Sequence, residues 1–81
     1  MFNSQQVVLS LAGRDKGQLM AVVHEDERGV WLADGKRRPL EHPKCKNPRH
    51  IRPLEDELGR EAMTTNRALR RALRTIAERD A

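Results

Sequence analysis

Cationic side chains are the residues of this sequence with the clearest chemical use, and most of the excess lies in one short segment. Residues 36–52 contain seven lysines and arginines and one acidic residue, Glu41. The seven cations are Lys36, Arg37, Arg38, Lys44, Lys46, Arg49 and Arg52. Clustered cations bind phosphate groups cooperatively. The segment therefore predicts contacts with a phosphate backbone rather than a merely solvated face.

A second candidate for phosphate contact is the loop at residues 12–17, which has a glycine near each end. Gly13 and Gly17 are expected to adopt positive φ and to shape the loop, so that its backbone can approach a phosphate closely. Arg14 and Lys16 can then reach outward to phosphate oxygens. A solvated hairpin loop explains the same composition equally well. The adjacent basic segment favours phosphate binding.

Metal binding and catalysis have weaker support. His42, Cys45 and His50, with His24, are four candidate zinc ligands, but paired cysteines are missing and two lysines flank Cys45. We expect no metal and no cofactor, and we expect Cys45 to be a free thiol. The acidic residues after residue 54 are typical of a helix start or a solvated segment. Without a catalytic triad or a paired acid and base, we expect no enzymatic activity.

Composition limits the core and the class of partner. The 81 residues are 37% hydrophobic and 35% charged, which predicts a thin core with little material for a deep pocket. The net charge of +4 indicates an anionic partner. Aromatic residues make up only 2%, so structured RNA is favoured over single strands, which need stacking platforms. No apolar run is long enough for a membrane span, and we expect a cytoplasmic location.

Short strands are expected to position these cations in the first half of the chain. Apolar runs at residues 6–11, 18–24 and 30–33 predict three strands, the first two as a hairpin around the glycine loop. A fourth strand is expected to begin near Lys36, after the Asp34-Gly35 turn signal, and an edge strand is expected around residues 50–52. The predicted core comprises Val7, Leu9, Leu11, Leu19, Ala21, Val23, Val30 and Leu32. A slip of one residue would instead bury Val8, Met20, Val22 and Trp31.

The last part of the chain predicts a helix. It would start at a cap among residues 64–66 and end at residue 79, with one apolar stripe formed by Leu69, Leu73 and Ile76. Residues 54–81 carry six cations and six acids and are neutral overall. The four arginines that flank the stripe are therefore expected to matter less for phosphate binding: Arg67, Arg70, Arg71 and Arg74. The predicted division is a barrel at 1–53 and a helical extension at 54–81.

Residues 7–23, VVLSLAGRDKGQLMAVV, resemble a KOW motif, a strand, glycine loop and strand unit of ribosomal proteins and transcription elongation factors. With VWLADG at 30–35 and PKCKNPRHI at 43–51, residues 5–53 resemble short bacterial KOW-domain RNA-binding proteins related to archaeal and eukaryotic large-subunit ribosomal proteins. The resemblance implies a mainly β fold, a five-stranded SH3-like barrel followed by a C-terminal helix. It also implies structured RNA, above all ribosomal RNA, as the partner, with ribosomal proteins as further candidates.

A second function class stays open at this point. SH3-like barrels also serve as protein-interaction modules, and either the barrel or the apolar helix stripe could hold a partner protein or a second copy of the chain. Binding through phosphates should weaken steeply with salt, whereas binding through an apolar stripe should hardly respond.

Overall fold

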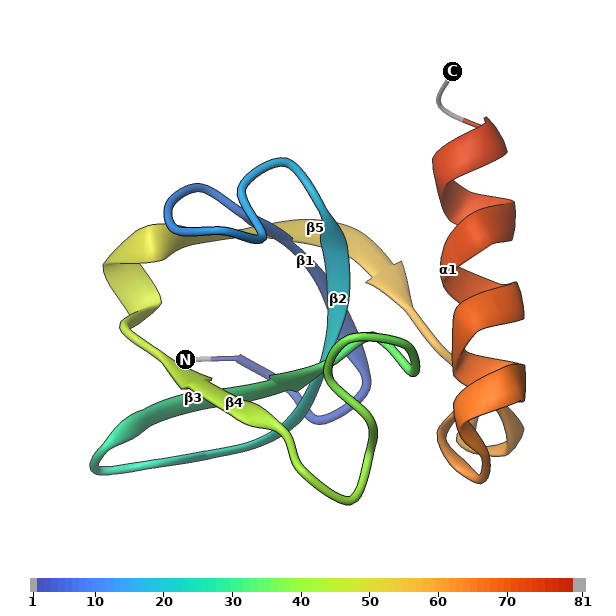
Figure 1. Cartoon of the computed structure of the whole chain (residues 1–81), viewed down its shortest axis with the longest axis horizontal. Helices are drawn as coiled ribbons and strands as arrows, with labels where there is room; N and C mark the ends of the chain where they lie inside the picture. The colour runs from blue at the N-terminus through green and yellow to red at the C-terminus, as the bar shows by residue number, and fades with distance from the viewer. Residues whose placement is uncertain (1, 80–81) are drawn as a thin grey trace.

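Five short strands and a C-terminal helix make up the structure, a computed structural model that describes residues 2–79 (Figure 1). The strands are β1 (Gln6–Ser10), β2 (Leu19–Asp26), β3 (Gly29–Ala33), β4 (Lys44–Lys46) and β5 (Ile51–Glu57). A 3₁₀ turn, η1 (Pro48–His50), precedes β5, and a second, η2 (Arg60–Met63), precedes the helix α1 (Asn66–Arg79). The mainly β class and the C-terminal helix are confirmed.

The strands form one antiparallel sheet in the order β4-β3-β2-β1-β5, which curls around its own inner face (Figure 1). The sheet is open, so the expectation of a barrel is wrong in that respect: within residues 2–79, no strand pairing joins the edge strands β4 and β5. Prolines account for the open edge. β4 has only three residues and lies between Pro43 and Pro48, and Pro53 of β5 has no N–H to donate to a neighbouring strand.

The predicted hairpin around the glycine loop is confirmed, but the fourth strand begins later than predicted. Residues 34–38 form a turn, because the Asp34 carboxylate accepts hydrogen bonds from the backbone N–H groups of Lys36 and Arg38, both at 2.9 Å. β4 begins only at Lys44. The edge strand predicted around residues 50–52 is longer than expected, since β5 continues to Glu57 and crosses the predicted division at residue 53.

The hydrophobic core has two parts, one on each face of the sheet. The inner cluster, inside the curl, consists of Val8, Met20, Val22, Val30, Leu32 and Ile51. The outer cluster, between the sheet and α1, consists of Val7, Ala21, Ala33, Leu69, Leu73 and Ile76. Strands β1 and β2 are therefore buried on both faces, which requires consecutive apolar residues rather than strict alternation.

The prediction of a core on one face of each strand was wrong in part. Four of its residues are buried: Val7, Ala21, Val30 and Leu32. Leu9, Leu19 and Val23 are half-buried, and Leu11, just beyond the end of β1, is 42% exposed. From the alternative register, Val8, Met20 and Val22 are also buried, and Trp31 is half-buried. The alternation of side chains along a strand cannot show which face is buried when the curled sheet covers one face and α1 covers the other.

Helix α1 has the predicted extent and the predicted buried stripe of Leu69, Leu73 and Ile76. Among the three candidate caps, the Thr65 hydroxyl accepts a hydrogen bond from the Ala68 N–H at 3.0 Å. At the other end, the Arg79 guanidinium donates to both carboxylate oxygens of Asp56 on β5, at 2.8 and 2.9 Å. The helix is thus held against the sheet along its length, which sets the direction in which its arginines project.

Candidate nucleic-acid interface

The glycine loop between β1 and β2 is held in shape by its own backbone. Gly13 and Gly17 have φ of +88° and +87°, which confirms the predicted left-handed conformation at both positions. The Gly17 N–H donates to the Ser10 carbonyl at 2.8 Å, and the Lys16 N–H donates to the Gly13 carbonyl at 3.2 Å. Arg14 and Lys16 lie between the glycines and are exposed.

Lys46 supports this loop from beneath. Its side chain is 6% exposed, and its ammonium donates to the Asp15 carboxylate at 2.5 Å and to the Ala12 carbonyl at 2.6 Å. The Ser10 hydroxyl also donates to Asp15, at 2.7 Å. The sequence suggests Lys46 as a phosphate contact, but the structure buries its charge against Asp15. Lys46 therefore positions the loop and is not exposed to a ligand.

Asp15 is a buried anion among cations. Burial by itself raises the pKa of a carboxyl group. In Asp15 the hydrogen bonds from Lys46 and Ser10 and the charges of Lys46 and Lys44 outweigh burial, so the pKa lies below its usual value. Lys44 reaches the other carboxylate oxygen at 3.7 Å. Asp15 is consequently ionised at neutral pH, with its charge engaged inside the protein.

Four of the predicted phosphate-binding cations line one hollow of about 340 Å³ beside the glycine loop. We call it the loop hollow, and its cations are Arg14, Arg37, Arg38 and Lys44. They come from three segments: the glycine loop, the turn after β3, and β4. Two carboxylates, Asp15 and Asp34, also line it, and both accept hydrogen bonds within the protein. The cations therefore dominate the groups that an incoming ligand can reach.

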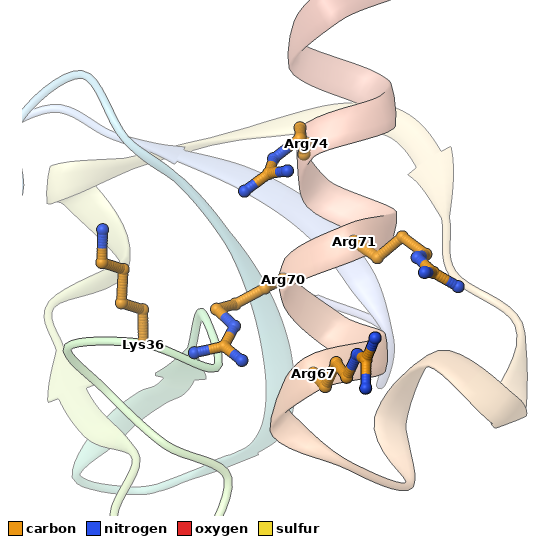
Figure 2. A pocket seen from close by; sticks show the side chains of 5 residues that line it. All are labelled: Lys36, Arg67, Arg70, Arg71 and Arg74. Atoms are coloured by element: carbon orange, nitrogen blue, oxygen red, sulfur yellow. The ribbon is translucent and has the colours of Figure 1, made fainter.

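A second hollow of about 400 Å³ lies against α1, and cations alone line it. We call it the helix hollow, and its residues are Lys36, Arg67, Arg70, Arg71 and Arg74. Figure 2 shows Arg70 and Arg74 reaching from α1 toward Lys36, whereas Arg71 points to the other side of the helix. Sequence reasoning gave these arginines little weight because residues 54–81 are neutral overall. Their spacing of three and four residues was the signal that could have revealed a shared surface.

The two hollows are parts of one surface. Between them lies a third depression, which shares Lys36, Arg70 and Arg74 with the helix hollow and Gln18 and Asp34 with the loop hollow. We call the cations of both hollows together the cationic surface. It spans the glycine loop, the turn at residues 34–38, β4 and α1.

Besides the buried Lys46, three predicted contacts lie outside both hollows. Lys16, Arg49 and Arg52 are exposed, on the glycine loop, η1 and β5 respectively. Each is free to meet a phosphate, but none lines the hollows described above. Lys36, the remaining predicted contact, belongs to the helix hollow and not to the loop hollow.

Aromatic and metal-ligating side chains within residues 2–79 form a stacked pair but no metal-binding cluster. The half-buried Trp31 ring stacks on His24, with 5.6 Å between ring centroids and 17° between planes. Its indole nitrogen is buried. Within residues 2–79, no three His, Cys, Asp or Glu side chains converge as metal ligands. In the same range, no helix has the length and apolar character that crossing a bilayer requires.

No protein-family model matches the chain, and no curated protein matches it at a significant level.

Proposed function

We propose that this protein binds structured RNA, without catalysis, through the loop hollow of its cationic surface. The observation that carries the proposal is the loop hollow, where Arg14, Arg37, Arg38 and Lys44 converge from three separate segments. Guanidinium and ammonium groups placed together in this way suit the phosphates of a nucleic-acid backbone. Arg14, Arg37 and Arg38 are exposed, whereas Lys44 is half-buried and pairs with Asp15, so the three arginines present most of the charge that a ligand can reach.

Two further observations support RNA with its own fold as the ligand. The one tryptophan stacks on His24, which leaves few aromatic faces for unpaired bases. The KOW-like sequence at residues 7–23 forms a strand, glycine loop and strand, as the resemblance implies, and this favours ribosomal RNA among structured RNAs. Contacts would be made chiefly to phosphates and sugars.

Protein binding is a second candidate function, and the structure supports it through a different surface from the helix stripe that the sequence suggests. The apolar stripe of α1 is buried against the sheet of its own chain, so it is not open to a partner. A shallow groove on the other flank of α1 is open instead. Apolar side chains such as Leu58 and Ala62 line it, and its three acids, Asp56, Glu57 and Glu61, outnumber its one cation, Arg71, which suits a basic segment of a protein.

The test is binding of the full chain to a fluorescently labelled ribosomal RNA hairpin, measured by anisotropy across a series of salt concentrations. We expect log K to fall linearly with log salt. Changing Arg37→Gln/Arg38→Gln should lower the slope by about two units, roughly one for each phosphate that the variant no longer neutralises. The matched control is Arg28→Gln/Arg60→Gln, which removes two exposed cations that line neither hollow.

Two outcomes would contradict the proposal. One is affinity that does not change with salt. The other is an equal decrease of binding in the control variant, which would mean that only the overall charge matters. An unlabelled single-stranded oligonucleotide of the same length should compete weakly, and strong competition by it would argue against structured RNA.

A further inference from the structure

The helix hollow contains five cations for which the described residues show no stabilising role in the fold. All five are exposed, and among residues 2–79 none of them forms an ion pair. The four arginines of the hollow form pairs of like charge three or four residues apart on α1: Arg67, Arg70, Arg71 and Arg74. Such pairs destabilise a helix in isolation, and a bound anion would relieve them.

The fold holds this arrangement in place from two sides. Leu69 and Leu73 anchor α1 on the sheet, so its arginines project from a fixed face. On the other side, the turn that carries Lys36 is pressed against the start of the helix. Gly35, with φ of +80°, passes so close that an added Cβ would collide with the Asn66 carbonyl. The Leu40 N–H also donates to the Asn66 side chain at 2.8 Å.

We infer that the helix hollow is a second backbone-binding site of the protein, where α1 grips the phosphates of the same RNA that occupies the loop hollow. The inference rests on the proposed function. It follows from the third depression, in which Arg70 and Arg74 of α1 meet Gln18 and Asp34 of the loop hollow without a break. A strand of linked phosphates matches such a track better than a single compact anion does.

The chemistry of the hollow matches that ligand. Arginine is the side chain best suited to phosphate, because its planar guanidinium can donate two parallel hydrogen bonds and stays charged at all relevant pH values. No acidic side chain lines the helix hollow. Glu41 accepts a hydrogen bond from the Asn66 side chain, and Asp56 pairs with Arg79. Glu78, the one acid of α1, is not among the residues that line the hollow.

Three double variants with the same change of charge separate this inference from the proposed function. They are Arg70→Gln/Arg74→Gln in the helix hollow, Arg37→Gln/Arg38→Gln in the loop hollow, and Arg28→Gln/Arg60→Gln outside both. Binding to the labelled RNA hairpin is measured against salt for each. We expect the helix variant to lower the salt slope by about two units, as the loop variant does, and the control to leave it unchanged. Circular dichroism should show the same helix content in all three.

The outcomes are distinct. If the loop variant lowers the slope and the helix variant does not, the inference is wrong and the proposed function stands. If neither variant differs from the control, the proposed function fails as well. Inorganic tripolyphosphate provides the last arm. The inference is overturned if tripolyphosphate binds the wild type tightly and its affinity depends on Arg70 and Arg74, whereas the affinity for RNA does not. The helix hollow would then be a site for free polyphosphate.

Discussion

At the scale of single residues, the cations of this protein are either exposed to a ligand or buried in ion pairs, and the sequence alone does not distinguish the two. Lys16 projects from the glycine loop into water. Lys46 lies beneath the same loop with its ammonium on Asp15 and on the Ala12 carbonyl. The difference arises because Lys16 lies on the exposed part of the loop, whereas Lys46 belongs to β4, which holds its side chain beneath the loop. Charge counted along the chain therefore overstates what a ligand can reach.

Replacing Lys46 with methionine should destabilise the fold. Lys46→Met keeps the length of the side chain but leaves the Asp15 carboxylate buried without its closest cation. Removing one partner of a buried ion pair costs about 3 kcal/mol. Urea denaturation followed by circular dichroism measures the decrease in stability. Lys16→Met is the matched control, an exposed lysine of the same loop, for which we expect a change within about 0.5 kcal/mol. Equal stability of the two variants would mean that Lys46 does not support the loop.

Acid should weaken the contribution of Asp15. Its pKa in the folded protein lies below the usual value of 3.8, so its stabilising effect is complete above that value and is lost as the pH falls through the lower, folded-state pKa. We expect Asp15→Asn to be less stable than the wild type at pH 7, with a gap of about 2–3 kcal/mol. The gap in unfolding free energy should narrow between pH 4 and pH 2. A gap that stays constant over that range would contradict the proposed ion pair.

At the scale of elements, α1 has two functions that share one piece of structure. Its buried stripe completes the outer core, and its arginines form most of the helix hollow. The sequence predicts the stripe because the spacing of Leu69, Leu73 and Ile76 repeats with the helix period. It does not predict what the stripe packs on. That surface is the outer face of β1 and β2, which presents Val7 and Ala21.

Shortening Leu73 should loosen the helix and the helix hollow together. Leu73→Ala leaves a cavity between α1 and the sheet and should cost about 3 kcal/mol. Differential scanning calorimetry measures the stability, and the RNA salt slope reports on the arginines. The control is Leu11→Ala, the same change at a leucine that is 42% exposed, where we expect less than about 1 kcal/mol. If both variants are destabilised equally, α1 is not packed as described.

The strands show how far pattern alone predicts a small sheet. Turn residues located the first hairpin, and the two glycines have the expected conformation because positive φ is costly for other residues. The later strands were harder to place. The Asp34 carboxylate accepts hydrogen bonds from the backbone of the turn at 34–38, and these bonds compete with strand pairing. The spacing of apolar residues along the sequence does not indicate this competition. Four prolines then limit β4 and keep the sheet from closing.

For the molecule as a whole, the candidate site assembles from parts that are distant in sequence. Five of the predicted contacts lie in the two hollows: Arg14, Lys36, Arg37, Arg38 and Lys44. The helix arginines were missed because the net charge of a segment says nothing about its faces. The acids of residues 54–61 lie on β5 and η2, whereas α1 itself carries five arginines and one glutamate. Only the fold separates these charges into different surfaces.

Salt should act on this molecule in two opposite directions. In the absence of RNA, added salt screens the unpaired cations from one another, so the free energy of unfolding should rise between 10 and 300 mM salt. Arg70→Gln/Arg74→Gln removes three of the like-charge pairs on α1, worth about 1 kcal/mol in total, and should make this rise smaller. RNA affinity should fall over the same range. A wild type that becomes less stable as salt increases would contradict the repulsion described here.

Helix α1 separates two flanks of opposite charge. Arg70, Leu73, Arg74 and Ala77 face the depression that leads to the loop hollow. Ala68, Arg71, Ala72 and Thr75 face the groove on the other side, where the three carboxylates of Asp56, Glu57 and Glu61 outnumber the one arginine. This separation gives the molecule an electric dipole moment directed across the helix. In the field of a polyanion, such a dipole orients the protein before contact, so that the arginine flank faces the polyanion and the acidic flank faces away from it. The first encounter with RNA is therefore already oriented, and productive collisions form a larger share of all collisions than for an evenly charged sphere.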